Sequence, residues 1–239
     1  MLVSALALAV LSAASLGRAA PTPESAEAHE LEARATSSAC PQYVLINTRG
    51  TGEPQGQSAG FRTMNSQITA ALSGGTIYNT VYTADFSQNS AAGTADIIRR
   101  INSGLAANPN VCYILQGYSQ GAAATVVALQ QLGTSGAAFN AVKGVFLIGN
   151  PDHKSGLTCN VDSNGGTTTR NVNGLSVAYQ GSVPSGWVSK TLDVCAYGDG
   201  VCDTAHGFGI NAQHLSYPSD QGVQTMGYKF AVNKLGGSA

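Results

Sequence analysis

Two spacings of apolar residues alternate along the chain, and together they predict strands alternating with helices. Runs that are apolar on successive positions, as in buried strands, occupy residues 43–47, 77–82, 111–116, 144–149 and 191–197. Apolar residues three or four positions apart, as on one helix face, occupy residues 60–72, 94–107, 120–132 and 220–235. This order predicts the doubly wound α/β class, with a central, mostly parallel, five-stranded sheet and helices on both faces.

Residues 150–190 interrupt the alternation. The stretch is rich in Gly, Asn, Ser and Thr, and it predicts a long loop with one candidate strand at residues 175–179. A loop of this length inside a compact domain is usually functional or mobile.

The N-terminal segment has a different composition from the rest of the chain. Residues 2–17 are apolar and uncharged, and they are shorter than the ~20 residues that a spanning helix needs. They predict a secretory signal peptide over residues 1–20 and no stable membrane insertion. Residues 21–34 hold four Glu and two Pro but no aromatic residue, and they predict a pro-segment. A single domain over residues 35–239 and an extracellular location follow from this interpretation.

Charge and cysteine content narrow the function classes. Only 10% of the residues are charged and the net charge is −1, which excludes a basic nucleic-acid-binding protein. The 43% of hydrophobic residues argues against disorder. No pairing motif stands out, so a monomer is expected. The five cysteines allow at most two disulfides in fifteen arrangements, of which the nearby pair Cys195 and Cys202 is the most economical.

The most informative motif is Gly117-Tyr118-Ser119-Gln120-Gly121. It lies between the apolar run 111–116 and the Ala-rich helix that begins at residue 120. A G-x-S-x-G sequence on a strand-to-helix turn is the nucleophile elbow of α/β-hydrolases. The glycines permit the tight turn, and the helix N-terminus lies directly after the serine. Ser119 is therefore the candidate nucleophile.

A serine nucleophile needs a base and a group that orients the base, in the chain order serine, acid, histidine. Three histidines follow the serine: His153, His206 and His214. Position near the C-terminus favours the last two. The candidate acids are Asp199, Asp203 and, less favoured on its strand, Asp193. Spacing alone leaves the choice open.

Four motifs together resemble the cutinase family of serine esterases. They are Arg49-Gly50-Thr51-Gly52-Glu53, the serine motif, Gly198-Asp199-Gly200-Val201-Cys202 and His214-Leu215-Ser216-Tyr217. The resemblance implies an α/β-hydrolase fold with Asp199 as catalytic acid and His214 as base. It also implies an oxyanion hole from the backbone N–H groups of Thr51 and Gln120. The disulfides that it implies are Cys40–Cys112 and Cys195–Cys202, whereas Cys159 has no counterpart.

The resemblance also implies a substrate class. Family members of the cutinase type cleave cutin, other aliphatic polyesters and short-to-medium-chain acyl esters, without a cofactor or metal. An open cleft needs apolar walls, for which Phe208, Ile210 and Leu215 are candidates. Weaker candidates in the long loop are Val183, Pro184 and Trp187.

Three other interpretations compete with a cutinase. The long 150–190 stretch favours the family's acetylxylan esterases as the alternative activity. Outside enzymes, a non-catalytic secreted surface protein on the same fold is the second alternative. A zinc site would draw on Cys195, Cys202, His206 and His214, although the cysteine spacing and an oxidising compartment disfavour it.

Overall fold

A computed structural model describes residues 40–239, so the predicted signal peptide and pro-segment lie outside the described residues. The centre of the fold is a six-stranded sheet in the order β2-β1-β3-β4-β6-β5, and every neighbouring pair is parallel. The strands are β1 (Tyr43–Thr48), β2 (Gly75–Asn79), β3 (Cys112–Tyr118), β4 (Val142–Ile148), β5 (Asn160–Val161) and β6 (Thr191–Val194).

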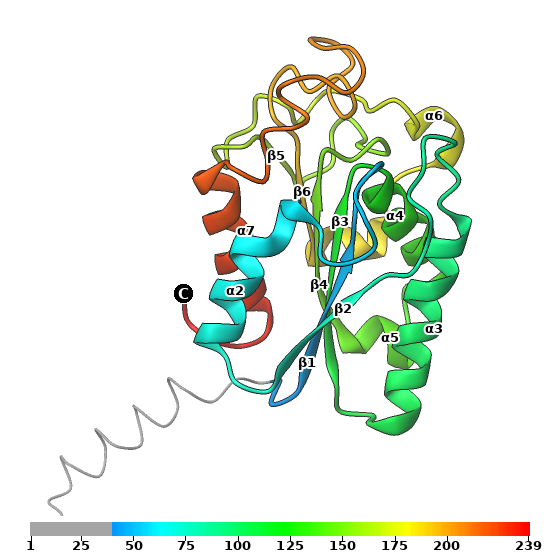
Figure 1. Ribbon diagram of the computed structural model, residues 1–239, viewed down its shortest axis with the longest axis vertical. Helices are drawn as coiled ribbons and strands as arrows, with labels where there is room; N and C mark the ends of the chain where they lie inside the picture. The colour runs from blue at the N-terminus through cyan, green and yellow to red at the C-terminus, as the bar shows by residue number, and fades with distance from the viewer. Residues whose placement is uncertain (1–39) are drawn as a thin grey trace, which may run out of the picture. The chain divides into compact units, whose positions relative to one another are not determined.

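Helices cover both faces of the sheet (Figure 1). One face carries η1 (Ala59–Phe61), α2 (Arg62–Ala71) and α7 (Gln221–Lys234). The other carries α3 (Ala91–Ala107), α4 (Gln120–Leu132) and α5 (Gly136–Ala141). Because all the strands run the same way, the loops that follow them gather at one end of the molecule. The predicted doubly wound α/β fold is therefore confirmed.

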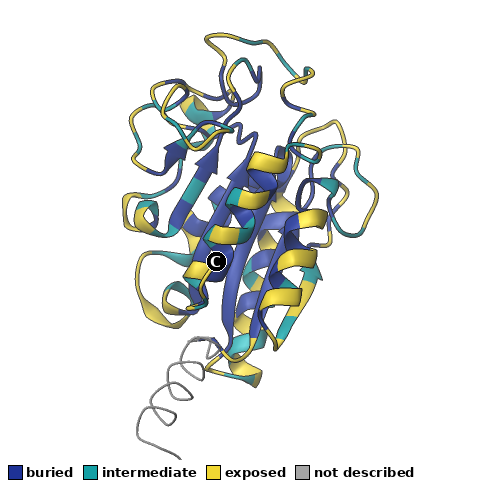
Figure 2. Cartoon of the chain, turned by 90° about the vertical axis from the view of Figure 1, so that its left-hand side faces the viewer, coloured by how far each residue is buried: buried dark blue, intermediate teal, exposed yellow. Residues whose placement is uncertain are grey.

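Alternating side chains on the strands build two cores. In β1, Tyr43 and Leu45 pack under α2 and α7, whereas Val44 and Ile46 pack under α3 and α4. The central strands are buried on both faces, and α2, α3 and α7 keep an exposed outer side, whereas α4 is buried over most of its length (Figure 2). This explains why the strands appear in the sequence as continuous apolar runs and the helices as periodic ones.

The predicted strand count and one predicted strand are wrong. The sixth strand, β5, has two residues, lies within the predicted loop and pairs with the outer side of β6. Residues 175–179 form no strand, because the N–H groups of Leu175 and Ser176 donate to Val201 and Pro151 instead of to a sheet edge. The short helix α6 (Val177–Gln180) stands there, and η2 (Ser185–Lys190) leads into β6.

Two disulfides brace the described chain. Cys40–Cys112 joins the segment before β1 to the start of β3, and Cys195–Cys202 closes the loop after β6. Both are the pairs that the family resemblance implies. Cys159 is a buried free thiol, and burial raises its pKa to about 12. Between residues 40 and 239, no helix has the length and apolar character that a membrane span requires.

Candidate active site

Ser119 occupies a strained turn between β3 and α4. Its φ angle is +54°, in a region that non-glycine residues rarely adopt. The two motif glycines are required by close packing. A Cβ on Gly117 would lie 2.6 Å from the Cα of Ala122, and one on Gly121 would lie 2.1 Å from the Thr48 carbonyl oxygen. The chain thus folds into a nucleophile elbow with Ser119 as the N-cap of α4.

Three predicted residues from three separate loops form one hydrogen-bonded chain. Ser119 Oγ lies 2.9 Å from His214 Nε2. The other ring nitrogen, His214 Nδ1, lies 2.9 Å from Asp199 Oδ1 and 3.0 Å from Oδ2. All three side chains are buried to at least nine-tenths, so water competes little for these contacts. Because the carboxylate can only accept, Nδ1 carries the proton and Nε2 is free to accept one from the serine hydroxyl.

The carboxylate of Asp199 has two further donors. The Val201 N–H donates to Oδ1 at 2.9 Å, within the loop that the Cys195–Cys202 disulfide closes. The Tyr217 hydroxyl donates to Oδ2 at 2.5 Å. Burial, followed by the charge of Asp199, raises the pKa of Tyr217 well above its usual value, so the phenol keeps its proton. Sequence reasoning missed this role, and the only available signal was the position of Tyr217 within the motif that carries His214.

Thr51 and Gln120 both lie close to Ser119, on two different segments. Gln120 is the first residue of α4, where a backbone N–H has no acceptor within the helix. In the turn after β1, the N–H groups of Gly50 and Gly52 donate to Glu53 and Ala84, while that of Thr51 has no acceptor in the described chain. The two side chains also meet, since Thr51 Oγ1 lies 3.4 Å from Gln120 Oε1.

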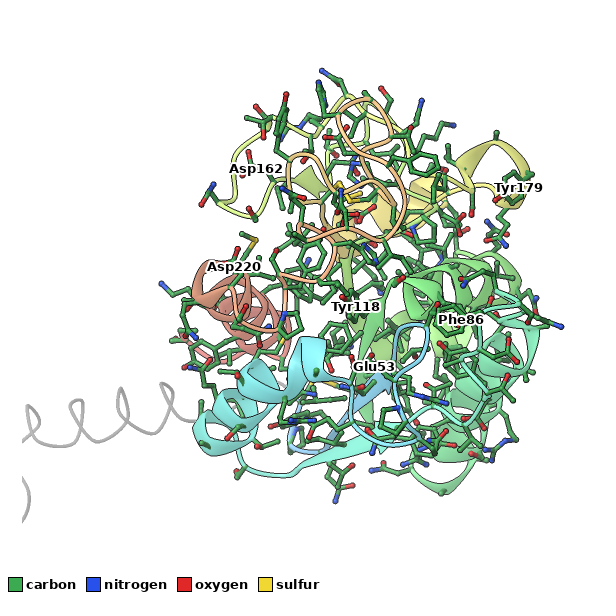
Figure 3. The ribbon with its side chains drawn as sticks, turned by 45° about the horizontal axis from the view of Figure 1, so that its top comes forward. Glu53, Phe86, Tyr118, Asp162, Tyr179 and Asp220 are labelled. Carbon is green, nitrogen blue, oxygen red and sulfur yellow. A yellow bond between two sulfur atoms is a disulfide. The ribbon has the colours of Figure 1, made fainter. Side chains whose placement is uncertain are left out.

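The turn that carries Thr51 is held by its flanking charged residues. Arg49 is buried and donates through Nε to the Glu53 carbonyl oxygen at 2.8 Å. The Glu53 carboxylate accepts from the N–H groups of Gly50 (2.6 Å) and Ala59 (2.7 Å) and from the Ser58 hydroxyl (2.7 Å). Figure 3 labels Glu53, which belongs to this turn, and Tyr118, which directly precedes Ser119. Arg49 and Glu53 therefore fix the turn, a function that their motif alone does not reveal.

Two cavities meet at Ser119. The larger has a volume of about 470 Å³ and runs between Gln88 and the segment that holds Leu175 and Tyr179. The smaller, about 210 Å³, contains His214 and Leu215. Ile210 borders both cavities. Of the predicted wall residues, Ile210 and Leu215 thus line the site.

Other predicted wall residues lie elsewhere. Phe208 is 91% exposed and borders neither cavity. Trp187 and Val183 are buried in the core under α4, where Trp187 packs edge-on against Phe139, and Pro184 directly precedes η2. The assignments of Val183 and Trp187 are wrong, because their segment packs against the sheet face that carries α3, α4 and α5, and Pro184 lines neither cavity.

The alternative histidines have partners of their own. His206 Nδ1 lies 2.9 Å from the Asp203 carboxylate and its ring stacks on Tyr197. The ring of His153 is fully buried, with Nδ1 3.0 Å from Asp193 Oδ2. Neither histidine has a hydrogen bond to Ser119 within residues 40–239. The zinc alternative is also wrong, because two of its four proposed ligands, Cys195 and Cys202, are bonded to each other.

Comparisons with known proteins place the chain in a family. The family model described as Cutinase matches residues 39–235. Carboxylesterase Culp1 of Mycobacterium tuberculosis is 28% identical over 200 residues, which are 82% of each protein. A cutinase of Kineococcus radiotolerans is 30% identical over 203 residues, covering 81% of this chain and 61% of that protein. The catalytic core of an acetyl xylan esterase from Trichoderma reesei superposes with a TM-score of 0.66 at 24% identity, over 82% of this chain and all of that one, and shows a shared fold.

Proposed function

The chain belongs to the cutinase family and is a serine ester hydrolase, and we propose that it cleaves aliphatic polyesters, such as cutin, and short-to-medium-chain acyl esters through Ser119, His214 and Asp199. The observation that carries this proposal is the buried chain of hydrogen bonds from the Ser119 hydroxyl through His214 to Asp199. Among residues 40–239, no other histidine has a hydrogen bond to Ser119, the serine that occupies the strained turn.

The mechanism is a two-step acyl transfer. Ser119 Oγ attacks the ester carbonyl carbon while His214 Nε2 takes the hydroxyl proton. The carbonyl oxygen becomes an oxyanion, which accepts hydrogen bonds from the N–H groups of Gln120 and Thr51. His214 then gives its proton to the leaving alcohol, and the acyl group stays on Ser119. Water repeats the sequence and releases the acid, while Asp199 keeps the imidazole oriented and stabilises its cation.

The two cavities suggest where the halves of the ester lie. The leaving alcohol must be close to His214, which lines the smaller cavity. The acyl chain then extends into the larger one, between Gln88 and Leu175. Its volume of about 470 Å³ is within the range of cavities that enclose whole small ligands, so it has room for far more than an acetyl group. This favours the cutinase type over an acetylxylan esterase.

The rim of the site supports an apolar, uncharged substrate. Large apolar side chains from three separate segments are exposed at the site. Tyr179 (73%), Ile210 (51%) and Leu215 (60%) line the cavities, and Phe86 (79%) lies beside Gly52, next to Thr51. Residues 81–90, 171–189 and 191–228, which include these side chains, contain no Lys or Arg. An exposed apolar rim without Lys or Arg suits the surface of a neutral polyester better than the surface of an anionic polymer.

Hydrolysis of p-nitrophenyl esters from acetyl to palmitoyl tests the proposal, with Ser119→Ala as control. We expect a serine-dependent rate that is highest at butyryl or longer and that persists on a polyester film. A rate confined to acetyl esters would favour the acetylxylan esterase activity instead. Equal rates for the control and the parent would refute the triad and favour the non-catalytic alternative.

We propose further that the protein is secreted and acts as a monomer. The two disulfides support the first statement, because such bonds persist in oxidising compartments. Sequencing the N-terminus of the protein from culture medium tests it. A mature chain that begins near residue 35 is expected, and retention of residues 1–20 would contradict the signal peptide.

A further inference from the structure

Tyr217 makes a directed contact with the candidate triad. Its side chain is fully buried, and its hydroxyl lies 2.5 Å from Asp199 Oδ2 and 3.0 Å from the Ala196 backbone nitrogen. The Ala196 N–H can only donate, so the phenol oxygen accepts that bond. The phenol proton is then committed to the carboxylate. The direction of both bonds is thus fixed by the chemistry of the two partners.

The ring of Tyr217 is held from several sides. Its backbone carbonyl accepts from Gln224 Nε2 of α7 at 2.9 Å. Its ring meets those of Tyr118 and His214 edge to face, with centroids 5.9 and 6.2 Å away. A Cβ on Gly149 would lie only 3.0 Å from the Tyr217 ring, so the loop after β4 closes the remaining side. The hydroxyl therefore has little freedom to leave Asp199.

Tyr118 provides a contrast within the same site. It is a buried tyrosine beside His214, but its hydroxyl donates to the His214 backbone carbonyl at 2.7 Å. It has no hydrogen bond to a carboxylate in the described chain. The two tyrosines thus both pack beside His214, but only the Tyr217 hydroxyl donates to the Asp199 carboxylate.

We propose that Tyr217 is a positioning residue for the hydrolytic reaction, and that its hydroxyl fixes the orientation of the Asp199 carboxylate and draws charge from it. This inference rests on the proposed function of the triad. Val201 supplies a donor to Oδ1 and Tyr217 one to Oδ2, so both carboxylate oxygens keep their place while facing His214 Nδ1. Without the phenol, Oδ2 has no donor besides the imidazole among residues 40–239, so the carboxylate keeps more of its charge but is held less firmly in its orientation.

The first test is Tyr217→Phe, assayed with p-nitrophenyl butyrate. We expect kcat to fall between about 10- and 100-fold with KM nearly unchanged, as for a misplaced catalytic group. Tyr113→Phe is the matched control: Tyr113 is equally buried, but its hydroxyl bonds the Ile101 carbonyl under the opposite face of the sheet. It should lose stability without losing kcat. Rates are normalised to the folded fraction measured by near-UV circular dichroism.

The pH profile separates positioning from simple packing. With less charge withdrawn from Asp199, the imidazolium is better stabilised, so the acid limb of kcat/KM should move to higher pH in Tyr217→Phe. Tyr118→Phe should leave the limb in place. In the described chain, the titratable groups on the elements around this pair are Tyr118, Glu53, Asp203 and His206. None of them changes between the variants except Tyr118 itself.

A second substitution covers the case in which Tyr217→Phe does not fold. Site-specific 3-fluorotyrosine at position 217 keeps the ring and hydroxyl but makes the phenol a stronger donor. The acid limb should then move to lower pH, opposite to the phenylalanine variant. An unmoved limb in every folded variant, with kcat within about twofold of the parent, overturns the proposal. If Ser119→Ala is also fully active, the proposed function itself has failed; if it is inactive, only the role of Tyr217 has.

Discussion

Asp152 provides the sharpest test of the electrostatics of this fold. It lies in the loop after β4, is fully buried, and neither carboxylate oxygen has a hydrogen-bond partner within the described residues. Burial, and then the nearby charge of Asp193, raise the pKa of Asp152 from 3.8 to about 7. The folded protein therefore binds a proton there over a pH range in which the unfolded chain has released it.

The sign and size of the effect follow from linkage. Well below pH 3.8 the carboxyl is protonated in both states, and its contribution to stability is complete. As the pH rises from 4 to 7, only the unfolded chain releases the proton, so the free energy of unfolding falls by about 1.4 kcal/mol per pH unit. Over the interval from 3.8 to about 7 the loss is about 4 kcal/mol. In Asp152→Asn this loss should be absent.

Urea unfolding of both proteins at pH 4, 5.5, 7 and 8 measures the difference. Asp152→Asn should gain about 4 kcal/mol relative to the parent between pH 4 and pH 8. Asp162→Asn is the control from the same loop. Burial opposes the shift, but hydrogen bonds from Thr168, Gly166 and Asn164 lower the pKa of Asp162 below 3.8. The stability that Asp162→Asn loses relative to the parent should therefore be complete by about pH 5 and stay constant above it. A parent-minus-variant difference that is flat with pH for Asp152→Asn would refute the reasoning.

Three further predictions concern the site. Thr51→Ala should lower kcat, but it should raise the activation free energy by less than the roughly 2.7–4 kcal/mol that loss of a whole oxyanion donor costs, because the backbone N–H remains. An unchanged kcat would exclude a role for the Thr51 hydroxyl. Glu53→Gln puts an NH2 group in place of one carboxylate oxygen, either against the Ala59 N–H or against the Gly50 N–H and the Ser58 hydroxyl. On the butyrate ester, kcat should then fall at least about tenfold while KM changes little, and normal kinetics would show that the turn does not need the carboxylate. Replacing both Cys195 and Cys202 by Ala should lower the free energy of unfolding by about 2.5 kcal/mol, measured by urea unfolding, and should also lower kcat for ester hydrolysis. Full activity would show that the disulfide is not needed to hold Asp199 in place.

The sheet and helices were predictable where periodicity is strong. The runs that become β1, β3 and β4 are buried on both faces, and α4 directly follows the serine motif, so pattern and structure agree. The long loop was not predictable in detail. β5 has only two residues, too few for a pattern, and α6 is one turn whose position depends on hydrogen bonds to Pro151 and Gln130.

The site residues were also predictable only where a local sequence pattern marks them. Ser119 is evident from its local motif, because the elbow needs glycines on both sides. The pairing of His214 with Asp199 was left open by spacing and resolved only through the family resemblance. The contacts of Tyr217 and Glu53 are invisible in the sequence, since they join groups whose directions depend on the finished fold.

The parallel sheet also determines where the protein can be attached to a support or a second module. Cys40 is joined to Cys112 at the amino end of β3, and Gly237 packs beside Leu72, at the end of α2 near the start of β1. Cys40, the first residue of the described chain, therefore lies at the pole opposite Ser119, which is at the carboxyl end of β3. A linker to a bead, a cell wall or a polymer-binding module can be attached ahead of Cys40. The opening of the cleft then faces away from the attachment point.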